Sequence, residues 1–419
     1  MSLKIVAIVL FVYAISFLFC SVVLTVHAQS DLQTTKYRNM DIDLGNGLKT
    51  NARLNLPANG DGPFPSVLLV PGSGPVDMNE TIGHVRIDNE TGSIVYPPTR
   101  PFFEIAEYLS ERGFAVLQYD KRGVGANFTI LDSNVWGNVT IDDLKQDAEK
   151  ALNVLIQQPE ADANHVTLVG HSEGTMIAPR VAIDNPGKVK NIVLMGSVAQ
   201  NFSDIGYFQA VANPVHYAQQ VLDHDYNGLL SVQEVSENPV FSSLVGNLTL
   251  ALTQNITTVN RTAEKLNPQY NTNNDTFISI NDELKPRLID YLKSLSVVIP
   301  GEKCLADPCP IWTRSHYSSI PILDIISKVP SDTSILIQQG NNDSQTTIQQ
   351  AFLLQQELTD GPDHTLITYP DLGHVFYPSS QWLTAFGPME QTVLEDLFGW
   401  LSDPVRDYKR LTILSSQIT

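Results

Sequence analysis

Cysteine and basic residues are both scarce in this sequence. Three cysteines among 419 residues are too few for a small disulfide scaffold. Lysine and arginine number 26 against 45 acidic residues, which gives a formal net charge of −19. A chain this acidic would repel phosphate groups, so we expect no nucleic-acid partner. The sequence contains no internal repeat and no low-complexity tract, and its 42% hydrophobic content is that of an ordinary globular protein.

Charge is also missing from one long N-terminal run. A single basic residue, Lys4, precedes an uncharged stretch from Ile5 to Val26, and Val26-His27-Ala28 resembles a signal-peptidase site. We expect residues 1–28 to be a signal peptide, with an uncleaved membrane anchor as the alternative. The protein is therefore expected to be secreted or extracytoplasmic. Glycosylation sequons fit an exported glycoprotein, and they include Asn79, Asn127, Asn138, Asn247, Asn255 and Asn260.

Two cysteines lie outside this run. Cys304 and Cys309 flank a turn-prone Leu-Ala-Asp-Pro segment, which could bring their side chains within bonding distance. An oxidising compartment favours a disulfide over two free thiols. The pattern predicts a Cys304–Cys309 bridge that closes a short loop and adds modest stability.

The chain divides by its secondary-structure pattern. Short β-branched runs alternate with helical patterns over residues 29–201 and again over residues 331–405, which is typical of a mostly parallel sheet flanked by helices. The alternation stops over residues 202–330, a segment rich in Asn, Thr and Gln. These features predict an α/β core in two parts with an inserted, largely helical cap. Residues 406–419 form a tail without a clear pattern.

A Gly-x-Ser-x-Gly motif connects a strand to a helix. Gly170-His171-Ser172-Glu173-Gly174 follows an expected strand at 165–169 and begins an expected helix at 172–182. In a nucleophile elbow the serine occupies a tight turn that only glycine neighbours allow, and the turn exposes its hydroxyl above the sheet. We therefore predict that Ser172 is a catalytic nucleophile. The alternative is a glycine-rich turn with an idle serine.

A serine nucleophile needs a base and an orienting acid, which follow it in the chain order Ser, acid, His. His374 lies in the loop after the expected strand 365–369, whereas His364 opens that strand at its other end. Catalytic side chains collect after the carboxyl ends of parallel strands, so His374 is the predicted base. Asp343 follows the preceding strand and is the predicted acid. Its alternative role is to cap the next helix.

The loop after an earlier buried strand supplies the second half of a predicted oxyanion hole. Pro71-Gly72-Ser73-Gly74-Pro75 follows the strand at 66–70. The backbone N–H of Ser73 (or of Gly74) and that of Glu173 are the expected donors to a developing oxyanion.

Taken in order, these motifs resemble those of α/β-hydrolases of the carboxylesterase type, which are grouped with dienelactone-hydrolase-like and serine-aminopeptidase-like proteins. The matching segments cover about residues 41–200 and 334–401, and they are Val70–Pro75 with Asp77 and Glu80, Tyr119–Gly125, Gly170–Gly174, Gly340–Asp343 and Gly373-His374. The resemblance implies an α/β-hydrolase fold and an acyl-enzyme mechanism. In one departure, Pro71 stands where the family commonly has histidine. Arg122 in the second segment is expected to form a structural ion pair.

A calcium-binding pattern lies inside the cap. Residues 223–234 match the twelve-residue EF-hand loop, including glycine at position 6 in Gly228. The predicted Ca²⁺ ligands are Asp223, Asp225, Asn227, the carbonyl of Leu229, Ser231 and Glu234. The alternative is a polar turn that matches by chance. EF-hand loops usually pair, but the sequence pattern shows no second loop, which predicts a lone and weak structural site.

The sequence is compatible with three functions. The first is an exported carboxylic-ester hydrolase with a structural Ca²⁺ in its cap. The second is a serine peptidase or aminopeptidase that uses the same triad on short peptides, although the cap shows no clear acidic pair to hold an amino terminus. The third is a calcium-binding surface protein with a silent hydrolase fold, which the intact triad disfavours. Either enzyme would take a small-molecule ester or a short peptide.

Overall fold

A computed structural model describes residues 35–82, 99–237, 252–254, 265–300, 303–304, 308–382 and 385–403. The expected signal peptide, the tail and the sequons at Asn247, Asn255 and Asn260 lie outside these residues. Among the described helices, none is long and apolar enough to cross a membrane.

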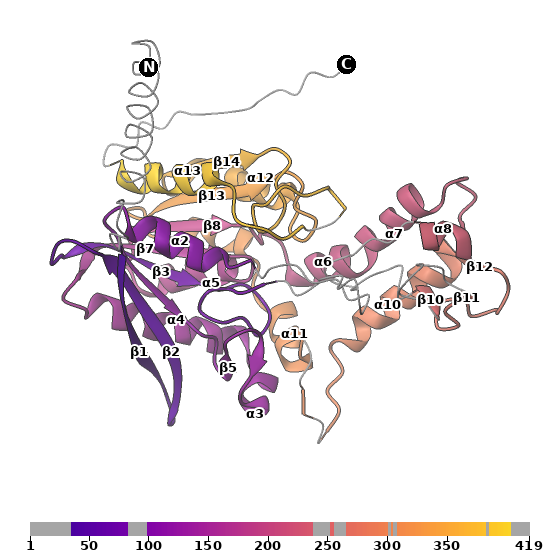
Figure 1. Ribbon diagram of the computed structural model, residues 1–419, viewed down its shortest axis with the longest axis horizontal. Coiled ribbons are helices and arrows are strands. Elements are labelled where there is room, and N and C mark those ends of the chain that lie inside the picture. Colours follow the sequence, from indigo (N-terminus) through magenta and orange to yellow (C-terminus); the bar gives the residue numbers. More distant parts are fainter. Residues whose placement is uncertain are drawn as a thin grey trace, which may run out of the picture.

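A sheet of eight strands forms the centre of the molecule (Figure 1). The hairpin of β1 and β2 is antiparallel, as is the pairing of β2 with β4, and all other neighbours are parallel. This confirms the expected mostly parallel sheet. In spatial order the strands are β1 (Thr35–Gly45), β2 (Leu48–Pro57), β4 (Ala115–Tyr119), β3 (Phe64–Val70), β7 (Ala161–His171), β8 (Asn191–Met195), β13 (Ser334–Gly340) and β14 (His364–Tyr369).

Helices cover both faces of the sheet because its central strands are apolar on both sides. In β3, Val67 and Leu69 belong to one hydrophobic cluster and Leu68 and Val70 to the other, and all four are fully buried. The helices α4 (Ile141–Ile156), α5 (Gly174–Asp184) and α12 (Ile348–Glu357) pack in the cluster that holds Leu68 and Val70. The helices α2 (Pro101–Ser110) and α13 (Gln391–Ser402) pack in the cluster that holds Val67 and Leu69.

The inserted segment has a hydrophobic core of its own and projects from one end of the sheet (Figure 1). Leu222, Leu230, Ile278 and Leu284 are fully buried there. Its elements are α6 (Phe202–Tyr207), η1 (Phe208–Ala212), α7 (Asn213–Tyr217), η2 (Ala218–Leu222), β9 (Leu229–Ser231), α8 (Val232–Glu237), β10 (Thr253–Gln254), β11 (Lys265–Leu266), β12 (Phe277–Ser279), η3 (Ile280–Leu284) and α10 (Lys285–Ser294).

The last part of the same segment returns to the sheet. Trp312 on α11 (Pro310–Tyr317), Ile322 and Val329 pack in the large cluster that also holds α4 and α5. Short elements complete the described chain, namely β5 (Val124–Gly125), β6 (Thr129–Ile130), α3 (Ser133–Gly137), η4 (Ile322–Asp324), η5 (Ile326–Lys328) and η6 (Leu358–Asp360). The helical stretch from residue 202 to residue 222 begins in the large core cluster and ends in the hydrophobic core of the cap.

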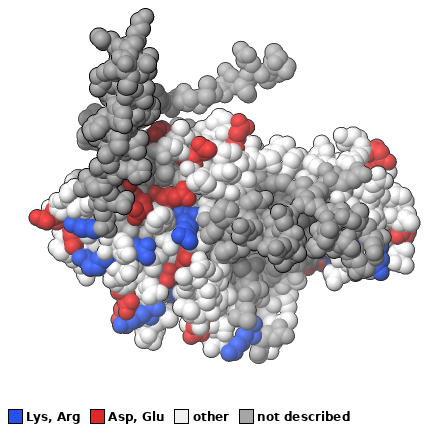
Figure 2. All heavy atoms as spheres, viewed as in Figure 1, with Lys and Arg blue, Asp and Glu red and all other residues white. Residues whose placement is uncertain are grey.

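Charge is mixed on the face shown in Figure 2, where basic and acidic side chains alternate over the end of the molecule that carries β1 and β2. Among the described atoms on that face, no continuous basic patch is seen.

Candidate active site

The turn between β7 and α5 forces Ser172 into an unusual backbone conformation. Ser172 has a φ of +53°, in the left-handed region that non-glycine residues rarely adopt. A Cβ on Gly170 would lie 2.3 Å from the carbonyl oxygen of Gly174, and a Cβ on Gly174 would lie 2.1 Å from that of Val70. No side chain fits at either distance, so the turn requires glycine at both positions. The geometry is that of the predicted nucleophile elbow.

His374 and Asp343 are in direct contact. His374 Nδ1 lies 2.8 Å from Asp343 Oδ2, and both side chains are buried. Asp343 also accepts hydrogen bonds from Gln339, the backbone of Gln345 and both donors of Thr346. Burial alone would raise the pKa of Asp343, but the neighbouring His374 and these hydrogen bonds hold it below its ordinary value. The carboxylate is thus ionised and placed to orient the histidine ring.

Gly196, directly after β8, makes room for that ring. It has a φ of +64°, and a Cβ on it would lie 3.1 Å from His374 Cε1 and Nδ1. Only glycine fits both the backbone conformation and the space available. The position of His374 therefore depends on three strand ends, those of β8, β13 and β14.

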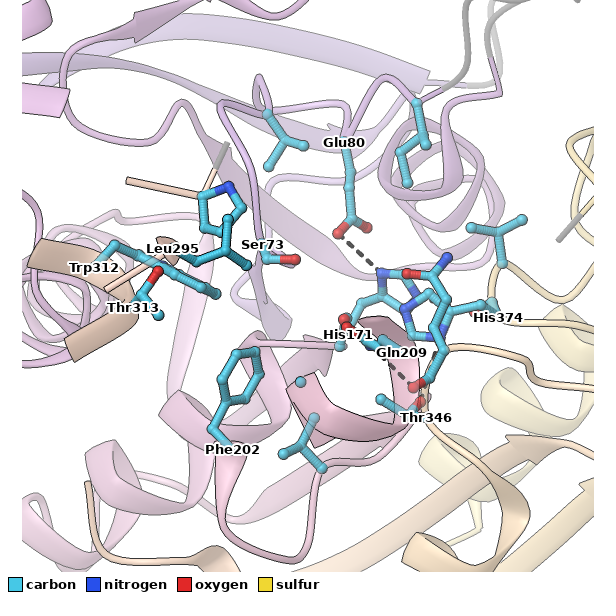
Figure 3. A pocket seen from close by; sticks show the side chains of 18 of the residues that line it. Ser73, Glu80, His171, Phe202, Gln209, Leu295, Trp312, Thr313, Thr346 and His374 are labelled. Carbon is cyan, nitrogen blue, oxygen red and sulfur yellow. Dashed lines mark hydrogen bonds and ion pairs between the residues drawn. The ribbon is translucent and has the colours of Figure 1, made fainter. Parts of the chain in front are cut away.

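Ser172 and His374 line one cavity of about 270 Å³. In Figure 3, Trp312, Thr313 and Leu295 lie on the side of the cavity opposite His374. Ser73 also lines the cavity, as predicted for the oxyanion loop. The walls are mostly apolar and aromatic, and they include Val76, Phe128, Val198, Phe202, Leu292, Tyr317 and Phe386.

A buried lysine joins the two predicted oxyanion segments. Lys121 Nζ donates to the carbonyl oxygens of Gly72 (2.8 Å) and Gly74 (3.2 Å), on either side of Ser73. It also lies 2.6 Å from Glu173 Oε2, and both charged side chains are almost completely buried. Glu173 is the N-cap of α5, so its backbone N–H is at the positive end of that helix. The ion pair fixes the loop of Ser73 relative to the elbow.

The other oxygen of Glu173 faces α11. Trp312 Nε1 donates to Glu173 Oε1 at 2.5 Å, and His316 Nε2 lies 2.8 Å from the same oxygen. Burial opposes ionisation, but Lys121 and His316 lower the pKa of Glu173 to about 2. A single carboxylate thus links the elbow to the oxyanion loop and to a wall of the cavity.

A second buried pair, Glu80 and His171, supports the loop of Ser73. Glu80 Oε1 accepts from the backbone N–H of Gly72 (2.7 Å) and from His171 Nδ1 (2.9 Å), as Figure 3 shows for the histidine. His171 Nε2 lies 3.0 Å from the carbonyl oxygen of His374. Because both ring nitrogens face acceptors, His171 is an imidazolium here. Burial works against this charge, but Glu80 raises the pKa of His171 above its ordinary value.

Sequence reasoning did not assign these supporting roles. Lys121, Glu80 and His171 each lie within a motif quoted above. The feature that could have indicated their roles is a charged or polar residue next to the end of a buried strand. The expectation for Arg122 is confirmed, since it forms ion pairs with Asp143 and Asp147. His364 lies at the start of β14, at the end of the strand away from His374.

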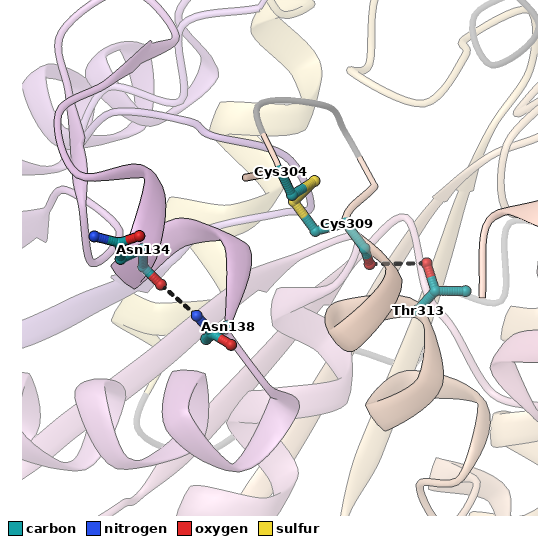
Figure 4. Close-up of a disulfide and its surroundings, with 5 residues drawn as sticks. All are labelled: Asn134, Asn138, Cys304, Cys309 and Thr313. Carbon is teal, nitrogen blue, oxygen red and sulfur yellow. Dashed lines mark hydrogen bonds between the residues drawn. A yellow bond between two sulfur atoms is a disulfide. The ribbon is translucent and has the colours of Figure 1, made fainter. Parts of the chain in front are cut away.

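The predicted disulfide is present. Cys304 and Cys309 are bonded, with their Cα atoms 5.9 Å apart, and Cys304 lies beside Gly137 at the end of α3 (Figure 4). Thr313 Oγ1 donates to the carbonyl oxygen of Cys309. The bridge therefore precedes α11, the helix that contacts Glu173.

The predicted calcium loop has a compact arrangement of oxygens. Ligand atoms of Asp223, Asp225 and Glu234 lie within 4.8 Å of one another, and Gly228 has a φ of +81°. Glu234 reaches back to the loop and accepts from the backbone N–H groups of His224 and Ser231. The other predicted ligands, Asn227, Leu229 and Ser231, lie on the same loop. The donor types and the fold of the loop suit a hard cation such as Ca²⁺.

Comparison with known proteins decides the family. A sequence model described as the alpha/beta hydrolase fold matches residues 91–380, more than half of the chain. The chain belongs to the α/β-hydrolase family. Within that family, Esterase EstD from Thermotoga maritima is 33% identical over 147 residues. The alignment covers 35% of this hydrolase and 30% of EstD, so less than a third of that relative's length is matched.

Solved structures similar to this hydrolase include Est1E and two peptidases. Est1E from Butyrivibrio proteoclasticus is 13% identical, with 87% of this chain and 97% of that chain covered and a TM-score of 0.44. The acylaminoacyl peptidase of Pyrococcus horikoshii is 11% identical, with 90% and 43% covered and a TM-score of 0.47. Dipeptidyl peptidase 4 of Porphyromonas gingivalis is 14% identical, with 88% and 35% covered and a TM-score of 0.45.

We predict that Glu173→Gln lowers both stability and hydrolytic activity. Removing one partner of a buried ion pair costs about 3–5 kcal/mol of unfolding free energy. Because the Ser73 loop loses its tie to the elbow, kcat/KM should fall about 100-fold, as expected for a misplaced catalytic group. The matched control is Asp147→Asn, which breaks the Arg122 ion pair away from the cavity. It should lose stability and keep kcat/KM; equal losses of activity in the two variants would contradict the role of the pair.

Low pH should destabilise the hydrolase because it protonates the Glu173 carboxylate. The pKa of Glu173 is about 2 in the folded protein and near 4.5 when unperturbed. Its stabilising contribution is complete above the unfolded value and is lost as pH falls through the folded value. Denaturant unfolding of the wild type should therefore show a steep loss of stability between these pH values. In Glu173→Gln the slope over this window should be shallower, and an unchanged slope would show that Glu173 is not responsible.

Proposed function

We propose that this hydrolase cleaves small, uncharged carboxylic esters with Ser172, His374 and Asp343 as its triad. The observation that carries the proposal is the convergence of a strained serine elbow and a buried Asp–His pair on one apolar cavity. The partial match to an esterase agrees with it. An intact triad in this arrangement argues against a silent fold.

The chemistry follows from the positions of these groups. Ser172 Oγ attacks the ester carbonyl carbon while His374 Nε2 takes its proton, and Asp343 stabilises the resulting imidazolium. The carbonyl oxygen becomes an oxyanion that the backbone N–H groups of Ser73 and Glu173 stabilise. As the tetrahedral intermediate collapses, the ester C–O bond breaks, and the alcohol leaves with the proton from His374. Water then attacks the acyl-enzyme by the same route, which releases the acid and restores Ser172.

The lining of the cavity favours esters over substrates with a free amino terminus. Among the described residues, Glu80 contributes the only carboxylate to the wall, and it is buried and accepts from Gly72 and His171. An ammonium group would need an available acidic partner once it leaves water. A cavity of about 270 Å³ with aromatic walls suits a compact apolar acyl or alcohol group.

We further propose that the hydrolase works outside the cytoplasm and holds Ca²⁺ in residues 223–234. The Cys304–Cys309 disulfide supports export, because such bonds persist in oxidising compartments. The calcium loop follows the helical stretch 202–222, whose first turns contribute Phe202 and Gln209 to the cavity. Gln209 Nε2 also donates to the carbonyl oxygen of Gln345, beside the catalytic acid. An ion in the loop would thus stabilise one wall of the cavity.

Covalent labelling tests the nucleophile. A fluorophosphonate probe should label the wild type and fail to label Ser172→Ala, because the probe reacts with an activated serine. Ser73→Ala is the matched control, since its side chain lies in the same cavity but only its backbone N–H has an assigned role. It should still be labelled. Labelling of Ser172→Ala would refute the assignment.

Parallel substrate panels separate the reaction classes. We expect the wild type to hydrolyse short-chain esters of uncharged acids with a kcat/KM far above that for aminoacyl amides. Turnover that is faster on aminoacyl amides would identify a peptidase, and labelling without turnover of either panel would contradict the proposed esterase.

Calcium removal should lower thermal stability. A ligand that binds only the folded state stabilises it by about 2.7 kcal/mol at 100 times its Kd. Chelator should therefore lower the melting temperature by a few degrees, and added Ca²⁺ should restore it. Glu234→Gln should gain less in melting temperature from added Ca²⁺ than the wild type does. An identical melting curve for the wild type with and without Ca²⁺ would overturn the site.

A further inference from the structure

A second loop lies against the predicted calcium loop. Strands β9 and β12 pair antiparallel, and Leu230 faces Ile278 in this pairing. Leu230 is the apolar residue at position 8 of the first loop. If Ile278 is given the same position, the second loop begins at Asn271, and its position 7 falls on Phe277. Both central residues are fully buried in the core of the cap.

The side chains at positions 3 and 5 are hydrogen-bonded to each other in both loops, with the donor and the acceptor exchanged. In the first, Asn227 Nδ2 donates to Asp225 Oδ2 at 2.7 Å; in the second, Asn273 Nδ2 donates to Asp275 Oδ2 at 2.9 Å. The backbone N–H of position 7 then donates to the side chain at position 5 in each loop, at 2.7 and 2.8 Å. The residues at position 4 have φ values of +58° and +57°. The two loops therefore share one backbone path.

A glutamate closes each loop at the same place. Glu234 accepts from the backbone N–H groups of positions 2 and 9 at 3.2 and 2.9 Å. Glu283 accepts from the corresponding N–H groups, those of Thr272 and Ser279, at 2.7 and 2.9 Å. Glu283 is the thirteenth residue of its loop, and the π-helical turn Ile280–Leu284 accommodates the additional residue. Asp282, which is twelfth, is exposed.

One buried oxygen in the second loop has no partner among the described residues. Asn271 at position 1 is 6% exposed, close to the 4% of its counterpart Asp223. Its Nδ2 donates to the carbonyl oxygen of Asp275 at 2.7 Å, which places the amide group inside the loop. Its Oδ1 is buried and receives no hydrogen bond from the described part of the chain. An unsatisfied buried acceptor is costly, and a cation bound inside the loop would satisfy it.

We propose that this second loop is a Ca²⁺ site paired with the first. Its ligands are the side-chain oxygens of Asn271, Asn273, Asp275 and Glu283 and the backbone carbonyl of Phe277. The second site has two carboxylates where the first has three, and affinity for Ca²⁺ rises with the number of charged ligands. The second site is accordingly the weaker of the two.

The paired sites would act on two of the helices that line the cavity. The helical stretch 202–222 enters the first loop, and α10 follows the second, with Leu292 and Leu295 at its far end in the cavity wall. The proposal rests on the site in the first loop and extends it to a pair. Calcium would then order two walls of the substrate cavity through one small sheet.

The sequence pattern conceals this loop for two reasons. Counted from its first ligand to its closing glutamate, both included, it has thirteen residues, so a twelve-residue template places Asp282 at the last position. It also has Thr276 at position 6, where EF-hand loops have glycine. The register of β9 and β12 supplies the alignment that the template lacks.

Calorimetric titration of the chelator-treated protein with CaCl₂ tests the proposal. We expect two binding events per chain, of which Glu234→Gln removes the tighter and Glu283→Gln the weaker. Asp282→Asn is the matched control, because it removes the same charge from the neighbouring exposed residue, and it should keep both events. Asn271→Asp gives up the hydrogen bond to the carbonyl oxygen of Asp275 but adds a charged ligand at position 1, and it should lower the Kd of the weaker event several-fold.

The outcomes separate the two sites. A single event that Glu234→Gln abolishes and Glu283→Gln retains would overturn the second site and leave the first. A single event with the opposite dependence would support the second loop and refute the first. Loss of the weaker event in Asp282→Asn in place of Glu283→Gln would overturn the thirteen-residue register. Absence of Ca²⁺ binding in the wild type would overturn both sites.

Discussion

The buried ion pair between Lys121 and Glu173 is the constraint on which the candidate site depends. Two charges removed from water are tolerable only when they are paired and hydrogen-bonded, and here Gly72, Gly74 and Trp312 complete the bonding. Because these partners come from different segments, the pair can form in only one arrangement of them. That arrangement joins the loop of Ser73 to the turn that carries Ser172.

The surrounding structure holds Ser172 in its strained backbone conformation. A serine at positive φ costs free energy. The close backbone contacts at the buried Gly170 and Gly174 hold the chain in this conformation. The imidazolium of His171, held between Glu80 and the carbonyl oxygen of His374, fixes the loop of the base in the same way. Phe202 and Trp312 line the cavity beside these supported groups.

Much of the core could be predicted because its signals are local. The apolar run of β3, the glycines around Ser172, and the positions of Asp343 and His374 after successive strands all follow from short-range rules. The supporting network could not be predicted, because Lys121, Glu80 and Trp312 meet only through the tertiary fold. The same holds for the second loop of the cap, whose relation to the first appears only in the pairing of Leu230 with Ile278. Function outside the cytoplasm and calcium binding remain predictions from the sequence.

We propose that the Lys121–Glu173 pair aligns two backbone donors on an oxyanion formed at Ser172. A crystal structure of the hydrolase after reaction with an organophosphonate, whose phosphoryl oxygen mimics that oxyanion, tests this alignment. We expect phosphorus bonded to Ser172 Oγ, with the phosphoryl oxygen about 2.7–3.1 Å from the backbone nitrogens of both Ser73 and Glu173. A phosphoryl oxygen that contacts neither nitrogen, or phosphorus bonded to another residue, would contradict it.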